Sequence, residues 1–232
     1  MVNALKYFNA ATAKEEPDYA DFAISNVAAD GSIVPMYTNI TLDHAWSVAD
    51  VVGYYHIAGI GSTRNLETHI FQVAKEDSIT DTVEWVAMDD AALSVFVPYP
   101  MLTTDTYAGY QLSTAAADFV EAQPESGVYY ATTKNKRNEN GERVKVEGFC
   151  VLPENWADSV YWTMDALSNL YEYGTLTDDE KAQVETTLAD LQAECYEVYN
   201  QLKVDPDNAT AISAAAAQKV HEACVALVNA VK

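Results

Sequence analysis

Basic residues are scarce in this sequence. Only 13 lysines and arginines stand against 35 aspartates and glutamates, so the formal net charge over the 232 residues is −22. A charge of this sign repels the phosphates of nucleic acids and anionic lipid head groups. We therefore expect neither a nucleic acid nor a membrane surface as a partner.

Cysteine is also rare, and long apolar runs do not occur. An odd number of cysteines, at positions 150, 195 and 224, argues against a disulfide framework and against a zinc site of the CxxC type. No apolar run approaches the ~20 residues that a membrane-spanning helix needs. The first residues lack the basic and apolar regions of a secretion signal, which favours the cytoplasm as the compartment.

Hydrophobic residues are plentiful, at 49% of the chain, and they fall into two kinds of pattern. Between residues 66 and 99, the runs LETHIFQVA, TVEWVAM and SVFVPYP are short and rich in β-branched and aromatic residues, which predicts an antiparallel meander. Residues 128–151 predict a second hairpin that turns at Asn140-Gly141, where positive φ is tolerated.

The second hairpin holds a large share of the positive charge. Five of the 13 basic residues lie in it: Lys134, Lys136, Arg137, Arg143 and Lys145. One interpretation is a patch that binds anions. The ordinary interpretation, which we favour at this point, is a hairpin tip exposed to solvent.

The remaining sequence is helical in pattern. Apolar residues spaced by three or four predict a helix over residues 154–173, and two matching apolar stripes predict an antiparallel helix pair over residues 176–232. A capping box formed by Thr177 and Glu180 begins the pair. The expected fold class is α+β, with a domain over residues 1–175 followed by the helix pair.

Ionisable residues lie close together beside the first strand of the meander. Glu67 and His69 share one face of that strand, and Arg64 approaches from the preceding loop. Burying such groups beside large hydrophobic residues is costly unless they are paired or hydrogen-bonded. They either line a cleft or hold a buried network together, and the pattern does not decide between the two.

The cysteines and histidines could form a catalytic centre or fill ordinary structural roles. Cys195 and Cys224 lie on the apolar helical stripes, where a thiol behaves as a small hydrophobe. Cys150 ends a strand in a more open setting, but no histidine is near it in sequence, so it stays an outside candidate for a nucleophile. A metal held by His44, His56, His69 and Glu67 lacks any HExxH or HxH spacing, and we expect no metal and no cofactor.

Three motifs resemble those of a known family. They are RNLETHIFQ from Arg64, VEWVA from Val83 and SVFVPY from Ser94, and their order and spacing are similar to the C-terminal half of the C69 dipeptidases. These are cysteine peptidases of the N-terminal-nucleophile hydrolase superfamily. The later stretches TDTYAGYQ and WADSVYWTMDAL add to the resemblance, which extends over roughly residues 30 to 205.

The resemblance implies both a fold and an activity. The fold is an αββα sandwich, and the nucleophile is an N-terminal cysteine whose own α-amine serves as the base for hydrolysis of dipeptides. Arg64, Glu67 and His69 would then support the substrate cleft.

The chain departs from this family pattern at one important point. It opens Met1-Val2-Asn3 and has no cysteine before Cys150. We therefore expect the C-terminal portion of a cysteine-type dipeptidase that is inactive alone and is completed by an N-terminal half or by a homo-oligomer. The alternative is a catalytically inactive binding or structural remnant of the same fold.

Overall fold

The chain divides into two units, Met1–Ala58 and Gly59–Lys232, and each is described by itself. The computed structural model describes residues 25–27, 33–35, 47–57, 65–73, 82–111, 115–174 and 176–231. In the first unit, β1 (Ser25–Val27) and β2 (Ile33–Pro35) pair antiparallel. The first unit also contains the helix α2 (Val48–Ile57).

The predicted meander is confirmed in the second unit. It consists of β3 (Glu67–Gln72), β4 (Val83–Met88) and β5 (Val97–Pro100), which form an antiparallel sheet in that order. Burial alternates along β3, with Thr68 and Ile70 buried and the residues between them exposed. This alternation follows from the period of two of a strand, and it sends one set of side chains to each face.

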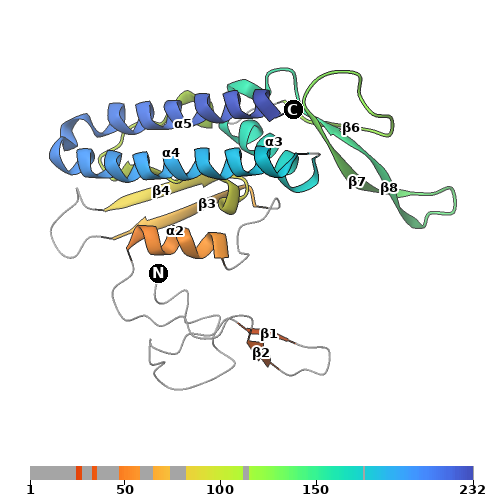
Figure 1. Cartoon of the computed structure of the whole chain (residues 1–232), viewed down its shortest axis with the longest axis horizontal. Helices are drawn as coiled ribbons and strands as arrows, with labels where there is room; N and C mark the ends of the chain where they lie inside the picture. The colour runs from red at the N-terminus through yellow and green to blue at the C-terminus, as the bar shows by residue number, and fades with distance from the viewer. Residues whose placement is uncertain are drawn as a thin grey trace. The chain divides into compact units, whose positions relative to one another are not determined.

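A second sheet contains the predicted hairpin. Its strands are β6 (Asp118–Val120), β7 (Tyr129–Arg137) and β8 (Arg143–Val151), in the order β6-β8-β7. Gly141 has φ +78°, which explains the glycine at this turn. Figure 1 shows β7 and β8 extending away from the helices as a long ribbon.

Three helices follow the second sheet. They are α3 (Val160–Tyr173), α4 (Asp178–Val204) and α5 (Ala209–Val231), and the last two lie side by side over the first sheet (Figure 1). The predicted capping box is present, since Thr177 accepts from the backbone of Glu180 and the Glu180 carboxylate accepts from that of Thr177. Pro206, in the short 3₁₀ turn Pro206–Asn208, helps to end the first helix of this pair.

The helices cover one face of the β3–β4–β5 sheet. Trp85 of β4 is fully buried and packs against the rings of Tyr196 and Tyr199 on α4. Gln72 of β3 accepts a hydrogen bond from Trp85 Nε1 at 3.2 Å and donates one to Tyr199 Oη at 2.6 Å. The apolar core therefore lies between this sheet face and α4.

A buried amide connects α4 to the chain just before β5. Gln192 Oε1 accepts from the Phe96 backbone N–H at 2.8 Å, and Gln192 Nε2 donates to the Phe96 carbonyl at 3.2 Å. Both hydrogen bonds are shielded from water, so leaving either group without its partner would be costly.

The expected α+β class is confirmed, because antiparallel sheets and a set of C-terminal helices form separate parts of the chain. Within the described ranges, no helix is long and apolar enough to cross a membrane.

Candidate functional site

The sheet face opposite the helices carries a polar cluster. Glu67 and His69 come from β3, and Glu84 comes from β4. Because Ile70 and Trp85 point into the core, strand alternation directs these three side chains outward. The strand register places Glu84 opposite Phe71, so Glu84 is the diagonal neighbour of His69, two residues along on the same face.

The imidazole of His69 lies between two carboxylates. His69 Nδ1 is 2.6 Å from Glu84 Oε1, and His69 Nε2 is 3.5 Å from Glu67 Oε2. A protonated ring can donate to both carboxylates, whereas a neutral ring donates from only one nitrogen. The His69 side chain is 33% exposed and stacks on Phe71, so the cluster is open to a ligand on one side.

A groove runs along this face of the sheet. Its volume is about 670 Å³, within the range typical of small-molecule sites. One wall is formed by the segment after β5, including Met101 and Thr103–Thr106. The remaining lining side chains combine the polar cluster with apolar surface: Glu67, His69, Phe71, Val83, Glu84, Val86, Met88, Tyr99, Pro100 and Tyr110, together with Thr82.

The structure brings together two of the three residues singled out in the sequence. Glu67 and His69 lie in contact and line the groove, and their role in substrate binding stays a prediction. Arg64 lies outside the described residues. Glu84 was not recognised as part of the cluster, since only the strand register, which the sequence does not specify, places it beside His69.

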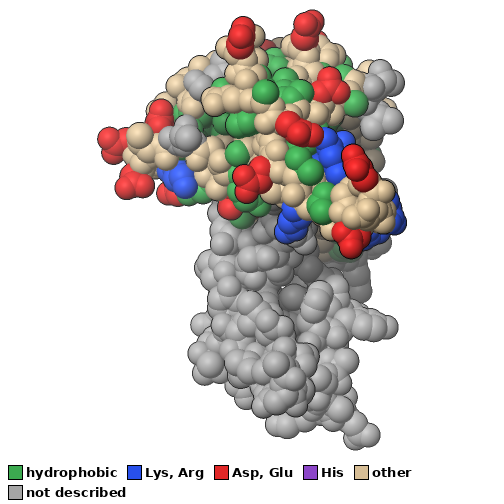
Figure 2. Space-filling view, turned by 90° about the vertical axis from the view of Figure 1, so that its right-hand side faces the viewer, with side chains coloured by type: hydrophobic (Ala, Val, Ile, Leu, Met, Phe, Trp, Pro, Cys, Tyr) green, Lys and Arg blue, Asp and Glu red, His purple; other side chains and the backbone are tan. Residues whose placement is uncertain are grey.

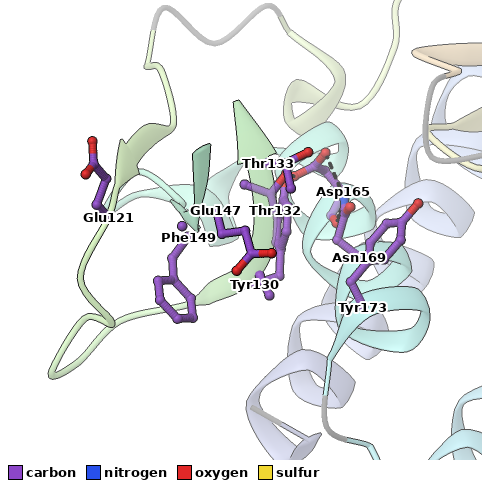
Figure 3. Close-up of a pocket in the computed structure, with 11 residues that line it drawn as sticks. Glu121, Tyr130, Thr132, Thr133, Glu147, Phe149, Asp165, Asn169 and Tyr173 are labelled. Carbon is purple, nitrogen blue, oxygen red and sulfur yellow. Dashed lines mark hydrogen bonds between the residues drawn. The ribbon is translucent and has the colours of Figure 1, made fainter. Parts of the chain in front are cut away.

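A second cavity lies between β7 and α3 (Figure 3). Its volume is about 900 Å³, and Figure 3 shows Asp165 and Asn169 of α3 facing Tyr130 and its neighbours on β7. Among the residues that the structure describes, no lysine or arginine lines it. The lining residues are Glu121, Tyr130, Ala131, Thr132, Thr133, Glu147, Gly148, Phe149, Asp165, Asn169 and Tyr173.

Asp165 is a buried carboxyl group in this region. Tyr130 Oη donates to Asp165 Oδ2 at 3.2 Å, and Asn169 Nδ2 is 3.2 Å from Asp165 Oδ1. Asp89 is also buried, accepts a hydrogen bond from Ser168 and has φ +59°, which is rare for a residue other than glycine.

Burial determines the ionisation of both acids. Loss of hydration raises the pKa of Asp89 to about 6, and hydrogen bonds from Ser168 and from the Asp90 backbone oppose this increase more than the charge of Asp90 adds to it. Burial, followed by the nearby charge of Asp89, raises the pKa of Asp165 to about 7. Their hydrogen bonds to Ser168, Tyr130 and Asn169 reduce these increases without cancelling them.

None of the three cysteines is in an activating environment. Burial raises the pKa of the half-buried Cys150 thiol, and the opposing effect of Tyr130 is smaller. Burial likewise raises the pKa of both Cys195 and Cys224 to about 12. The thiolate is the reactive form of cysteine, so these environments disfavour nucleophilic attack.

His221 is a buried histidine that the sequence did not single out. Its Nδ1 lies 3.1 Å from Tyr107 Oη, and its Nε2 lies 3.0 Å from Thr163 Oγ1. Burial lowers the pKa of His221, so the neutral ring connects α5 to α3 and to the loop before the 3₁₀ turn Ala108–Tyr110. We assign it a structural role.

The metal hypothesis is not supported by a ligand cluster in the part of the chain that the structure describes. There, no three His, Cys, Asp or Glu side chains are arranged so that they could hold an ion. His44 and the side chain of His56 lie outside the described residues.

Fold and site thus define an α+β protein with a polar groove on the face of the first sheet opposite the C-terminal helices. Residues 31–136 match the family model of peptidase family C69, and this match supports placing that segment in the family. The matched segment contains β3, β4 and β5 and ends within β7, so the three C-terminal helices lie outside it. No curated protein and no solved structure matches the chain.

Proposed function

We propose that this chain is the substrate-binding part of a cysteine-type dipeptidase. The observation that carries the proposal is that the groove and its Glu67–His69–Glu84 cluster are formed within the segment that matches a peptidase family. The groove on the β3–β4–β5 sheet receives the dipeptide.

The lining of the groove suits the chemistry of a free dipeptide. The carboxylates of Glu67 and Glu84 match the substrate's ammonium group, and charge-assisted hydrogen bonds of this kind are stronger than neutral ones. Phe71 and Met101 offer apolar surface for a substrate side chain. Arg64, three residues before the first residue of β3, suits the terminal carboxylate because a guanidinium can bind it with two hydrogen bonds.

The nucleophile comes from another polypeptide segment in this proposal. Cys150, Cys195 and Cys224 all have raised pKa values, so they stay protonated at neutral pH. A thiolate from the other segment attacks the scissile carbonyl, the amine leaves with a proton, and water then releases the acyl group. The groove orients the dipeptide for that attack.

Binding of dipeptides to the purified chain tests the proposal. We expect calorimetry to detect binding of a dipeptide that has a free amine. The double variant Glu67→Gln/Glu84→Gln should bind this dipeptide at least about tenfold more weakly, which is a loss of ~1.4 kcal/mol in binding free energy. The same dipeptide with an acetylated amine should bind both proteins equally weakly. Glu147→Gln, in the other cavity, is the matched control, and equal affinity of all three proteins would contradict the proposal.

A catalytically inactive binding protein is the second candidate function. The protonated state of all three thiols favours it, because a binding protein needs no nucleophile. Hydrolysis of dipeptides by the chain in its native complex, abolished by iodoacetamide, would exclude this candidate. Hydrolysis by the purified chain that is lost in Cys150→Ala would instead identify Cys150 as the nucleophile.

A further inference from the structure

The outer part of the β7–β8 hairpin reaches beyond the rest of its sheet. The third strand, β6, pairs only with Phe149–Val151 at the base of β8, so residues 132–147 form a two-stranded ribbon. Most of its side chains are exposed, including the apolar Val144 at 37%. We call residues 132–147 the basic ribbon.

The turn of the basic ribbon is well ordered by its own side chains. Asn138 Oδ1 accepts from the backbone N–H groups of Asn140 and Glu142, at 3.0 and 2.9 Å. Arg137 Nη1 donates to the Gly141 carbonyl at 2.6 Å. A two-stranded hairpin is only marginally stable in water without further support, so an ordered ribbon of this length benefits from a surface to lie on.

One face of the basic ribbon concentrates positive charge. Arg137 lies directly opposite Arg143, and Lys145 lies on the same face two positions further along β8, with one acid, Glu147, two positions beyond it. Like charges at opposite positions of an antiparallel pair are destabilising. Among the described residues no salt bridge joins Arg143 or Lys145 to a carboxylate, so this face favours an acidic partner.

The other face of the ribbon is already engaged within the chain. Lys136 forms an ion pair with Glu121, and the ammonium groups of Lys134 and Lys136 lie 5.6 and 5.4 Å from the ring centre of Phe119. Figure 2, which looks onto this end of the molecule, shows Lys and Arg side chains together with acidic and hydrophobic ones. The charge that remains for a partner is therefore on the Arg137–Arg143–Lys145 face.

The same chain offers a complementary surface on α4. Its exposed acids Asp190, Glu194 and Glu197 are spaced four and three apart, so they form one stripe along the helix. Asp179 lies on the same stripe three turns earlier, and Glu194 is paired with Lys219 of α5. The charge of this stripe is negative, like the net charge of the whole chain, which is −22.

We propose that the basic ribbon of one chain docks on the acidic stripe of α4 in a second copy of the chain. Reciprocal docking, with each ribbon on the other copy's α4, gives a closed two-fold dimer. The interaction uses surfaces away from the groove and does not depend on the proposed peptidase function.

Sedimentation velocity of the full chain at increasing concentration tests the proposal. We expect dimers at about 0.1 M sodium chloride and their dissociation at about 1 M, because salt screens exposed charges. The variant Arg137→Glu/Arg143→Glu/Lys145→Glu should raise the dimer dissociation constant at least about tenfold. Lys134→Glu, on the engaged face of the ribbon, is the control and should change it little.

A charge swap makes the test specific for α4. Asp190→Lys/Glu197→Lys alone should weaken the dimer, and mixing it with the ribbon variant should restore association between the two. Circular dichroism establishes that each variant is folded. A chain that stays monomeric at low salt would overturn the proposal, and a monomer that instead binds a polyanion or anionic vesicles would assign the ribbon to a phosphate-bearing partner.

Discussion

Two buried carboxyl groups make the stability of this protein depend on pH. Asp89 and Asp165 have pKa values of about 6 and about 7, raised mainly by loss of hydration. The folded state therefore binds these protons more tightly than the unfolded state. This contribution to stability is complete below the pKa of an unfolded aspartate and is lost as the pH rises through 6 and 7.

Asp165→Asn should reduce this pH dependence. We expect the wild-type free energy of unfolding to fall by roughly 4 kcal/mol between about pH 5 and about pH 8. Above pH 5, Asp89 accounts for about one pKa unit and Asp165 for about two, and one unit corresponds to ~1.4 kcal/mol. The variant keeps an oxygen for the Tyr130 hydroxyl and should lose much less. Urea unfolding at both pH values measures the difference.

The exposed Asp207→Asn is the control for this measurement. His221 has the opposite effect on the pH dependence, because its lowered pKa reduces the stability of the fold as the pH falls. This contribution is the same in wild type and in the variants, so it cancels when their unfolding free energies are compared. A fall in stability that is the same in Asp165→Asn and in wild type would contradict the assignment.

At the scale of elements, the capping box decides how well α4 begins. Thr177→Ala removes the side chain that accepts from the Glu180 N–H, and we expect a loss of about 1 kcal/mol in unfolding free energy. Thr186→Ala, on an exposed turn of the same helix, should cost nothing because alanine is the better helix former. Chemical denaturation compares the two, and equal losses would show that the cap contributes nothing special.

Local sequence patterns predicted helices and strands of the second unit. They could not predict which residues of different elements would lie side by side. Strand alternation predicted that Glu67 and His69 share a face, and the three- and four-residue spacing predicted α4 and α5. Glu84 joined the cluster only through strand register. Asp89 and Asp165 are 76 positions apart, and in the sequence each resembles an ordinary solvated acid. No local pattern therefore predicted that both would be buried.

At the scale of the whole molecule, the net charge of −22 opposes folding through self-repulsion. Raising sodium chloride from about 0.1 M to about 1 M shortens the screening length from roughly 10 to 3 Å. We expect the melting temperature of the monomer to rise over this range, while the ribbon-mediated dimer weakens. Calorimetry at low protein concentration measures the first effect, and a melting temperature that falls with salt would contradict it.

The hydrogen bonds between Gln192 and Phe96 have a consequence for how the first sheet can grow. The Gln192 side-chain amide forms the two hydrogen bonds to the Phe96 backbone that a strand added at this edge would form. It therefore prevents another strand from pairing with the main chain at Phe96. In the described part of the chain, β3 forms the other edge of the sheet. A strand from another polypeptide that extends this sheet would therefore pair at β3, beside Glu67 and His69.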